Sequence, residues 1–117
     1  MRTTVLLVDD HAGFRARAKA LLEAEGFDVV GEAADGRSGV ATAERLHPDV
    51  ALVDVQLPDI DGFEVAAQLR AAATARRIIL ISGREETEYG DQVAQSAAHG
   101  FVAKADLTGD RLRGVSS

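Results

Sequence analysis

The chain contains no cysteine, so disulfide bonds, thiolate catalysis and zinc sites with cysteine ligands are all excluded. Aromatic residues make up only 4% of the 117 residues, whereas hydrophobic residues make up 46%. We therefore expect a core built from aliphatic side chains and alanine. Lysine is also scarce, because Lys19 and Lys104 are the only two in the sequence. At this length we expect residues 1–117 to form a single domain.

No run of about eighteen apolar residues occurs, and the N-terminus lacks the apolar segment and cleavage site of a signal peptide. These two absences predict a cytoplasmic protein that makes no membrane contact. The net charge is −6, and the thirteen lysine and arginine residues are scattered instead of forming a basic stripe. We therefore expect no nucleic-acid contact through this domain.

Aliphatic runs alternate with helical patterns along the chain. The runs expected to form strands cover residues 4–8, 27–33, 50–55, 77–82 and 100–104. Apolar residues at helical spacing follow the first three runs, and Gly26 and Pro48 stand where the first two helices should end. A further helix is expected over residues 86–98, where Val93 and several alanines supply the apolar face. A short last helix should begin near Leu107.

Strands that are aliphatic throughout, without alternating polar positions, are typical of a parallel sheet that is buried on both faces. The repeated alternation of strand and helix therefore predicts an α/β fold, with helices on both faces of a doubly wound, five-stranded parallel sheet. In such sheets the ligand site lies beyond the carboxyl ends of the strands, near the point where the strand order reverses. This rule tells us which residues to consider for function.

The carboxyl ends of the predicted strands carry three carboxylates, one hydroxyl and one of the two lysines, namely Asp9, Asp10, Asp54, Ser82 and Lys104. Three acids packed together raise one another's pKa unless a cation offsets their repulsion. Mg²⁺ suits this need, because it binds through one or two carboxylates and keeps positions for water and phosphate oxygens. A carboxylate nucleophile beside Mg²⁺ and a lysine can form an aspartyl phosphate.

These residues, in this order, resemble the signature of response-regulator receiver domains of two-component signalling, and the likeness covers essentially the whole chain. The matching positions are Asp9, Asp10, Asp54, Ser82, Phe101 and Lys104. The segments LLVDDH, DVQLPDIDGFEV and KADL are most similar to the LuxR/NarL branch, whose output domain is a helix-turn-helix. The resemblance implies a flavodoxin-like sheet with strand order 2-1-3-4-5 and a phosphorylation-dependent signalling switch.

The resemblance also implies a chemical role for the acidic residues and the lysine. Asp54 would accept the phosphoryl group from the phosphohistidine of a histidine kinase, and Lys104 would pair with the acceptor and then with the phosphate. Mg²⁺, or Mn²⁺ in its place, would bind Asp10, Asp54 and the backbone carbonyl of Gln56. Asp9 would act mainly through a metal-bound water.

A second group of residues would respond to the phosphate. By resemblance, Ser82 would move toward the phosphoryl group and Phe101 would rotate inward. This movement would change the surface near the fourth helix, the fifth strand and the fifth helix. Gln56, Gly83 and Arg84 would flank the phosphoryl group, where the residues of this family tune how long the phosphate survives.

The resemblance implies a histidine kinase or a phosphotransfer protein as partner, and it leaves homodimer formation open. DNA binding would belong to a C-terminal output domain that this chain does not carry. Whether the domain counts as an enzyme also stays open, because receivers catalyse their own phosphotransfer and autodephosphorylation but act primarily in signalling. A pseudo-receiver that keeps the fold only for docking usually lacks an acidic residue or the lysine, and this chain has them all.

A competing interpretation treats residues 31–38, GEAADGRS, as the P-loop of an NTPase between a strand and a helix. The P-loop needs a lysine where this chain has Arg37, and this interpretation leaves the acidic pair and Lys104 unexplained. The chain also departs from the receiver pattern, because Ala105 stands where most receivers have proline. The short last helix is a further departure, and it affects the surface that receivers often use for partners.

Overall fold

The computed structural model describes residues 2–116. Its five parallel strands form one sheet in the order β2-β1-β3-β4-β5. The strands are β1 (Thr4–Val8), β2 (Asp28–Ala33), β3 (Val50–Asp54), β4 (Arg77–Ser82) and β5 (Gly100–Ala103). The predicted sheet and its strand order are therefore confirmed.

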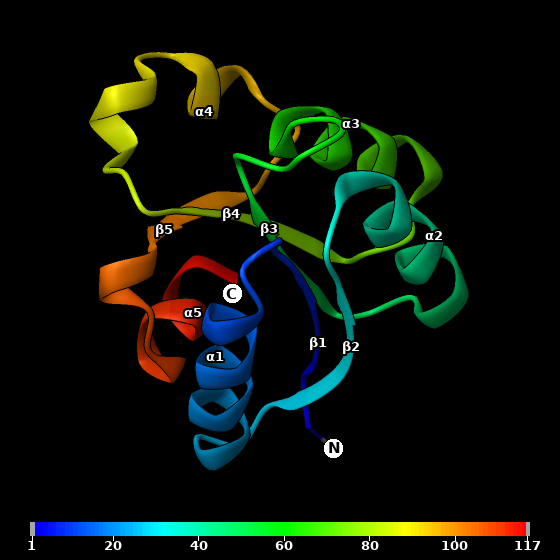
Figure 1. Ribbon diagram of the computed structural model, residues 1–117, viewed down its shortest axis with the longest axis vertical. Helices are drawn as coiled ribbons and strands as arrows, with labels where there is room; N and C mark the ends of the chain where they lie inside the picture. Colours follow the sequence, from blue (N-terminus) through cyan, green and yellow to red (C-terminus); the bar gives the residue numbers. More distant parts are fainter. Residues whose placement is uncertain (1, 117) are drawn as a thin grey trace.

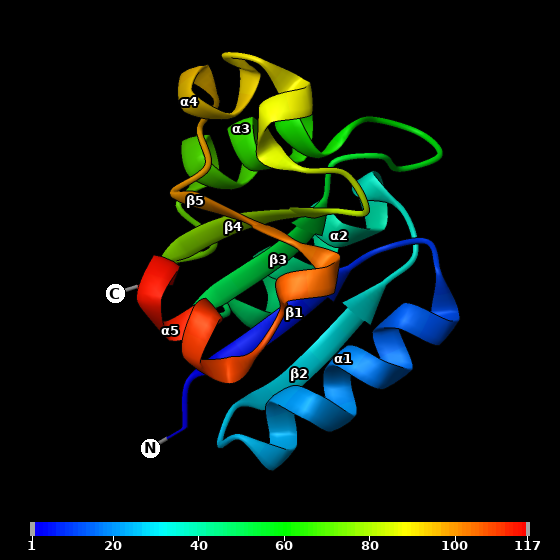
Figure 2. The ribbon, with the colours of Figure 1, turned by 90° about the vertical axis from the view of Figure 1, so that its left-hand side faces the viewer.

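Helices cover both faces of this sheet (Figure 1). They are α1 (Ala12–Ala24), α2 (Gly36–Leu46), α3 (Gly62–Ala72), α4 (Gln92–Gln95) and α5 (Gly109–Ser116). Two short 3-10 helices, η1 (Glu86–Tyr89) and η2 (Lys104–Asp106), precede α4 and α5. Helices α1 and α5 lie on one face, and α2, α3 and α4 lie on the other (Figure 2). No helix within residues 2–116 is long and apolar enough to cross a membrane.

The core has two layers because successive side chains of a strand point to opposite faces. In β1, Leu6 and Val8 join the cluster on the face of α2 and α3, whereas Val5 and Leu7 join the cluster on the face of α1 and α5. These four side chains are at most 1% exposed. Burial on both faces explains why this strand is aliphatic from Val5 to its end, so that the first carboxylate, Asp9, comes only after it.

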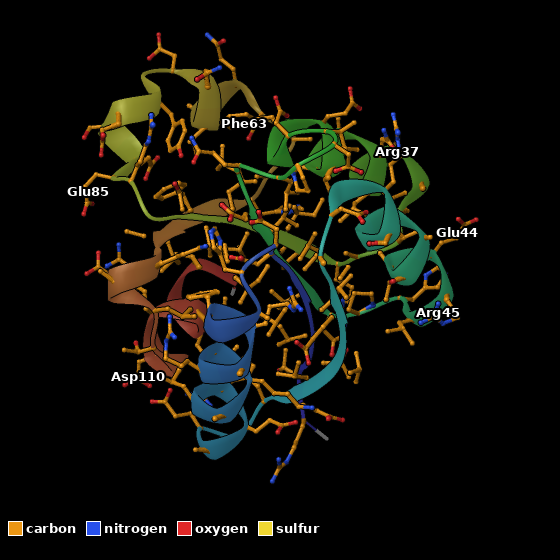
Figure 3. The ribbon with its side chains drawn as sticks, viewed as in Figure 1. Arg37, Glu44, Arg45, Phe63, Glu85 and Asp110 are labelled. Atoms are coloured by element: carbon orange, nitrogen blue, oxygen red, sulfur yellow. The ribbon has the colours of Figure 1, made fainter. Side chains whose placement is uncertain are left out.

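The N-terminus of α2 is occupied by two carboxylates of the chain itself. Asp35 accepts the N–H of Ser38, and Asp59 from the loop after β3 accepts the N–H groups of Gly36 and Arg37 at 2.8 and 2.9 Å. These bonds, above all the one from Arg37, lower the pKa of Asp59 to about 2. The Arg37 side chain points away from the molecule (Figure 3). A P-loop would need these amide groups for a phosphate, so the arrangement argues against the NTPase interpretation.

The helix predicted over residues 86–98 is wrong for most of its length. The segment η1 ends before Gly90, which has a φ of +59°, and α4 spans only Gln92–Gln95. Glycine adopts a positive φ readily, and this conformation cannot continue a right-handed helix. Val93 is the buried residue of α4. One valine and a few alanines offer too little apolar surface to hold a longer helix on the sheet.

The last helix is short, as predicted, and it is held against the end of α1. The N–H of Gly109 donates to Glu25 Oε2 at 2.6 Å, and the guanidinium of Arg113 lies 4.7 Å from the ring centre of Phe27. Leu112 is fully buried beneath these contacts. Helix α5 therefore packs on the sheet through Leu112 and the partly buried Val115, and it is joined to Glu25 and Phe27 by Gly109 and Arg113.

We expect Gly62→Ala to lower the free energy of unfolding by about 1–3 kcal/mol. A Cβ at this position would lie 2.8 Å from the Cα of Val55 and closer still to the carbonyl oxygen of Asp54. Both are backbone atoms, so the end of β3 would have to move. Urea unfolding measures the change, and Gly114→Ala is the control because no atom lies within 4 Å of its added Cβ. Equal losses in the two variants would contradict this explanation.

Candidate functional site

The carboxyl ends of four strands bring the predicted site residues to one edge of the sheet. Asp9 follows β1, Asp54 ends β3, Ser82 ends β4 and Lys104 follows β5. One ligand atom from each of Asp9, Asp10, His11 and Asp54 lies within 4.8 Å of the others. The strand topology thus collects residues that are 45 positions apart in sequence into one acidic cluster, defined here as these four residues.

Lys104 joins the two buried carboxylates of the acidic cluster. Its Nζ lies 2.5 Å from Asp9 Oδ2 and 3.2 Å from Asp54 Oδ2, and its side chain is 16% exposed. Burial alone would lower the pKa of Lys104, but its close contact with Asp9 and the charge of Asp54 raise it above 10.5. Nζ also lies 4.5 Å from the centre of the Phe14 ring, which holds the ammonium over the site.

The Asp54 carboxylate is almost completely removed from solvent, with 3% of the residue exposed. Burial raises its pKa above the ordinary value of 3.8; the charge of Lys104 opposes this change, and the charge of Asp9 adds to it. The backbone N–H of Gln56 donates to Asp54 Oδ1 at 3.2 Å. Lys104 therefore offsets only part of the cost of ionising Asp54, and a further cation at the cluster would offset more.

The two neighbouring acids of the cluster differ in how their oxygens are used. Asp9 is fully buried: its Oδ1 accepts the N–H of His11 at 2.7 Å, and its Oδ2 pairs with Lys104. The side chain of Asp10 is 37% exposed, and its Oδ1 lies 3.2 Å from Nδ1 of the exposed His11 ring. A cation could bind Asp10 without breaking a buried contact, whereas binding Asp9 would disturb Lys104.

Two residues at this edge, one inside the acidic cluster and one beside it, were not predicted from the sequence. His11 received no role, yet its Nδ1 lies 3.2 Å from an oxygen of Asp9 and from an oxygen of Asp10. Phe14 lies in the helix expected after the first strand, and its ring is 4.5 Å from the Lys104 ammonium. The position of His11 directly after the acidic pair was a usable signal, whereas the contact of Phe14 depends on how α1 packs.

The hydroxyl of Ser82 is engaged away from Asp54. Ser82 is 1% exposed, and its Oγ is hydrogen-bonded to the hydroxyl of Tyr89 at 2.5 Å and accepts the N–H of Arg84 at 3.0 Å. Phe101 is 7% exposed, so its ring is already buried in this state, before any inward rotation. Tyr89 was another residue that the sequence did not single out.

The three residues expected to flank a phosphoryl group are exposed at the same edge of the sheet. Gln56 is the second residue after β3, and Gly83 and Arg84 begin the loop after β4. Their exposure leaves them able to meet a group attached to Asp54.

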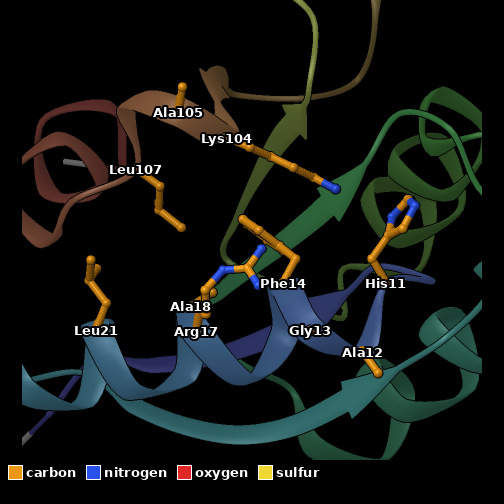
Figure 4. A pocket seen from close by; sticks show the side chains of 10 residues that line it. All are labelled: His11, Ala12, Gly13, Phe14, Arg17, Ala18, Leu21, Lys104, Ala105 and Leu107. Atoms are coloured by element: carbon orange, nitrogen blue, oxygen red, sulfur yellow. The ribbon is translucent and has the colours of Figure 1, made fainter.

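A groove of about 850 Å³ runs along α1 beside the acidic cluster (Figure 4). Its lining includes Phe14, Ala18, Leu21 and Leu107, and the Lys104 side chain extends across it toward the cluster. The groove therefore joins an apolar surface of α1 to the charged site.

The family model of the response regulator receiver domain matches residues 5–113. This range contains every residue of the acidic cluster, together with Ser82, Phe101 and Lys104. Among solved structures, the signal receiver domain of NarL from Mycobacterium tuberculosis is similar, with a TM-score of 0.86 and 32% identity. It covers 99% of this chain, and the match covers 98% of that domain.

Curated relatives are also similar. A Pseudomonas aeruginosa protein described as a transcriptional regulator is 34% identical over 108 residues, which are 92% of this chain and 52% of that protein. The DNA-binding transcriptional activator EvgA of Escherichia coli is 32% identical over 101 residues, which are 86% of this chain and 50% of EvgA. The chain thus spans about half the length of these relatives.

We expect Asp54→Asn to stabilise the metal-free protein at pH 7. Because the folded state raises the pKa of Asp54, it favours the protonated carboxyl, and this stability is lost as the pH rises from about 3.8 through the folded-state pKa. Asparagine keeps the shape without the charge. The stability difference between variant and wild type, from urea unfolding in EDTA, should grow from about pH 3 to pH 7. A stability difference that does not change with pH would contradict this prediction. Asp28→Asn, at an exposed position, is the control.

Proposed function

Because the chain belongs to the response regulator receiver family, whose members act in phosphorylation-dependent signalling, we propose that Asp54 accepts the phosphoryl group in this protein. The observation that carries the proposal is the setting of this carboxylate. Asp54 ends a central strand, its Oδ2 lies 3.2 Å from the Lys104 ammonium, and it shares the acidic cluster with Asp9 and Asp10. A phosphohistidine of a histidine kinase or of a phosphotransfer protein would be the donor.

In the proposed transfer, an oxygen of Asp54 attacks the phosphorus atom of the phosphohistidine. An oxygen–phosphorus bond forms, the phosphorus–nitrogen bond breaks, and the donor imidazole leaves with the electron pair. Lys104 is positioned by Phe14 to neutralise charge on the phosphoryl oxygens, since its ammonium already touches the acceptor. The transfer needs no further nucleophile, so positioning and charge neutralisation are the contributions required of the protein.

The donor set of the acidic cluster fits a hard divalent cation, because carboxylate and carbonyl oxygens are the ligands that Mg²⁺ and Mn²⁺ prefer. We assign Asp10 and Asp54 as direct ligands, with the backbone carbonyl of Gln56 as the third. Asp9 would act through water, because both of its oxygens are already engaged by His11 and Lys104. When bound, the cation would neutralise negative charge on the acceptor and on the phosphoryl oxygens.

The output of the switch lies beyond this domain in the proposal. EvgA is described as a DNA-binding transcriptional activator, and the chain matches half of its length. We therefore assign DNA binding to an output domain that is joined to the C-terminal end of the receiver. The phosphoryl group of a histidine kinase comes from ATP, so we place the reaction in the cytoplasm.

We expect a small phosphodonor such as acetyl phosphate to phosphorylate the wild-type chain in the presence of Mg²⁺ and not in EDTA. Asp54→Asn should abolish this labelling, because an amide cannot act as the nucleophile. Intact-mass spectrometry measures the added phosphoryl group. Glu64→Gln, which removes an exposed acid of α3, is the control and should be labelled normally. Undiminished labelling of Asp54→Asn would contradict the proposal.

We expect Asp10→Ala to weaken Mg²⁺ binding by about tenfold or more, equivalent to at least about 1.4 kcal/mol. Asp9→Ala should have a smaller effect, because Asp9 is held by Lys104 and does not bond the metal directly in this assignment. Calorimetric titration with Mg²⁺ measures both affinities. Equal losses in the two variants would count against the division of roles.

A further inference from the structure

Tyr89 is the one aromatic residue of η1, and its hydroxyl reaches the end of β4. The Tyr89 hydroxyl and Ser82 Oγ are 2.5 Å apart, and Ser82 is buried. The Tyr89 ring lies between two others, with its centre 6.0 Å from the Phe63 ring in an edge-on arrangement and 6.0 Å from the Phe101 ring. One side chain thus joins η1 to α3, β4 and β5.

The rest of η1 has few attachments to the sheet. Its other residues are exposed, and Glu85, which precedes it, points outward (Figure 3). The hydrogen bonds between Glu85 and Glu88 close the turn on itself without reaching another element. The position of η1 over β4 therefore depends on the ring and the hydroxyl of Tyr89.

The hydroxyl of Ser82 has one proton and two acceptor positions. The N–H of Arg84 takes one acceptor position, and Tyr89 takes either the proton or the second acceptor position. Within residues 2–116, no hydrogen bond of this hydroxyl goes to Asp54. Phosphoryl oxygens only accept hydrogen bonds, so a phosphoryl group on Asp54 would need the proton of Ser82. In the arrangement in which Ser82 donates this proton to Tyr89, Ser82 can bind the phosphoryl group only by giving up its bond to Tyr89.

We propose that Tyr89 is a positioning residue, which holds Ser82 away from the phosphoryl site and competes with the phosphoryl group for its hydroxyl. This inference rests on the proposed function, because it needs a phosphoryl group on Asp54. When Ser82 turns toward that group, Tyr89 loses its hydrogen bond, and η1 loses its polar attachment to β4. The phosphoryl group thus changes the segment between β4 and α4 through one serine.

Tyr89 provides its own measurement, because the chain contains one tyrosine and no tryptophan. The near-ultraviolet absorbance and intrinsic fluorescence of the protein therefore report on this phenol. We expect saturating Mg²⁺ and beryllofluoride, a mimic of the phosphoryl group, to change the tyrosine spectrum of the wild-type chain. Ser82→Ala should show a changed spectrum before the mimic is added, and a smaller further change afterwards.

The affinity for beryllofluoride, measured by calorimetry in Mg²⁺, tests the competition directly. Tyr89→Phe keeps the ring and removes the hydroxyl, so it should bind the mimic about two- to tenfold more tightly, as expected for one lost competing hydrogen bond. In a Ser82→Ala background the same change should have no effect, because the competition is already absent. Circular dichroism checks that each variant is folded.

A purely structural role of Tyr89 predicts a different result. In that case Tyr89→Phe would shift the affinity equally with and without Ser82, which would overturn the inference. If the wild type binds the mimic without any change in its tyrosine spectrum, the role of Tyr89 is overturned and the proposed function is not. Failure of the wild type to bind the mimic, or equal binding by Asp54→Asn, would overturn the proposed function and this inference together.

Discussion

The contact of the Lys104 ammonium with the carboxylates of Asp9 and Asp54 is the interaction on which the functional edge of this protein depends. Two buried carboxylates would repel each other, and each would lose its hydration. The single ammonium at 2.5 and 3.2 Å offsets part of this cost. Its effect is incomplete, since the pKa of Asp54 stays raised. The site is therefore stable enough to fold, and it keeps an unbalanced negative charge that a divalent cation can neutralise.

The strand order brings the residues of this contact together. β1, β3 and β4 lie side by side, and β5 closes the edge, so residues after each strand meet without any long loop. Gly62 lets α3 begin directly against the end of β3, and the Phe14 ring of α1 lies against the Lys104 ammonium. Backbone close to Asp54 is thus packed tightly, while Asp10 at the same edge keeps an exposed oxygen. Rigidity of the proposed acceptor and accessibility of the proposed metal ligand therefore come from residues of different burial at the same edge.

The sheet and the core of the site were predictable from the sequence, because buried parallel strands show as aliphatic runs and their ends show as the first polar residues. Asp54, Ser82 and Lys104 could be identified in this way. The helix over residues 86–98 could not be predicted correctly, because its end is decided by Gly90 and by the scarcity of apolar contacts. The sequence also could not predict that Asp9 pairs with Lys104 while Asp10 stays exposed, or that Ser82 is hydrogen-bonded to Tyr89. Both features depend on side-chain packing between distant segments.

The interrupted segment before α4 changes how a signal can leave the site. A continuous amphipathic helix would be held to the sheet by several apolar side chains, and one hydrogen bond of about 0.5–1.5 kcal/mol would be a small part of that attachment. Here Val93 and Tyr89 are the anchors of η1 and α4 on the core. The hydrogen bond between Ser82 and Tyr89 then supplies a large share of the energy that holds η1 on the sheet. The short helix α4, where the sequence predicted a longer one, thus makes the position of this surface sensitive to the hydroxyl of one buried serine.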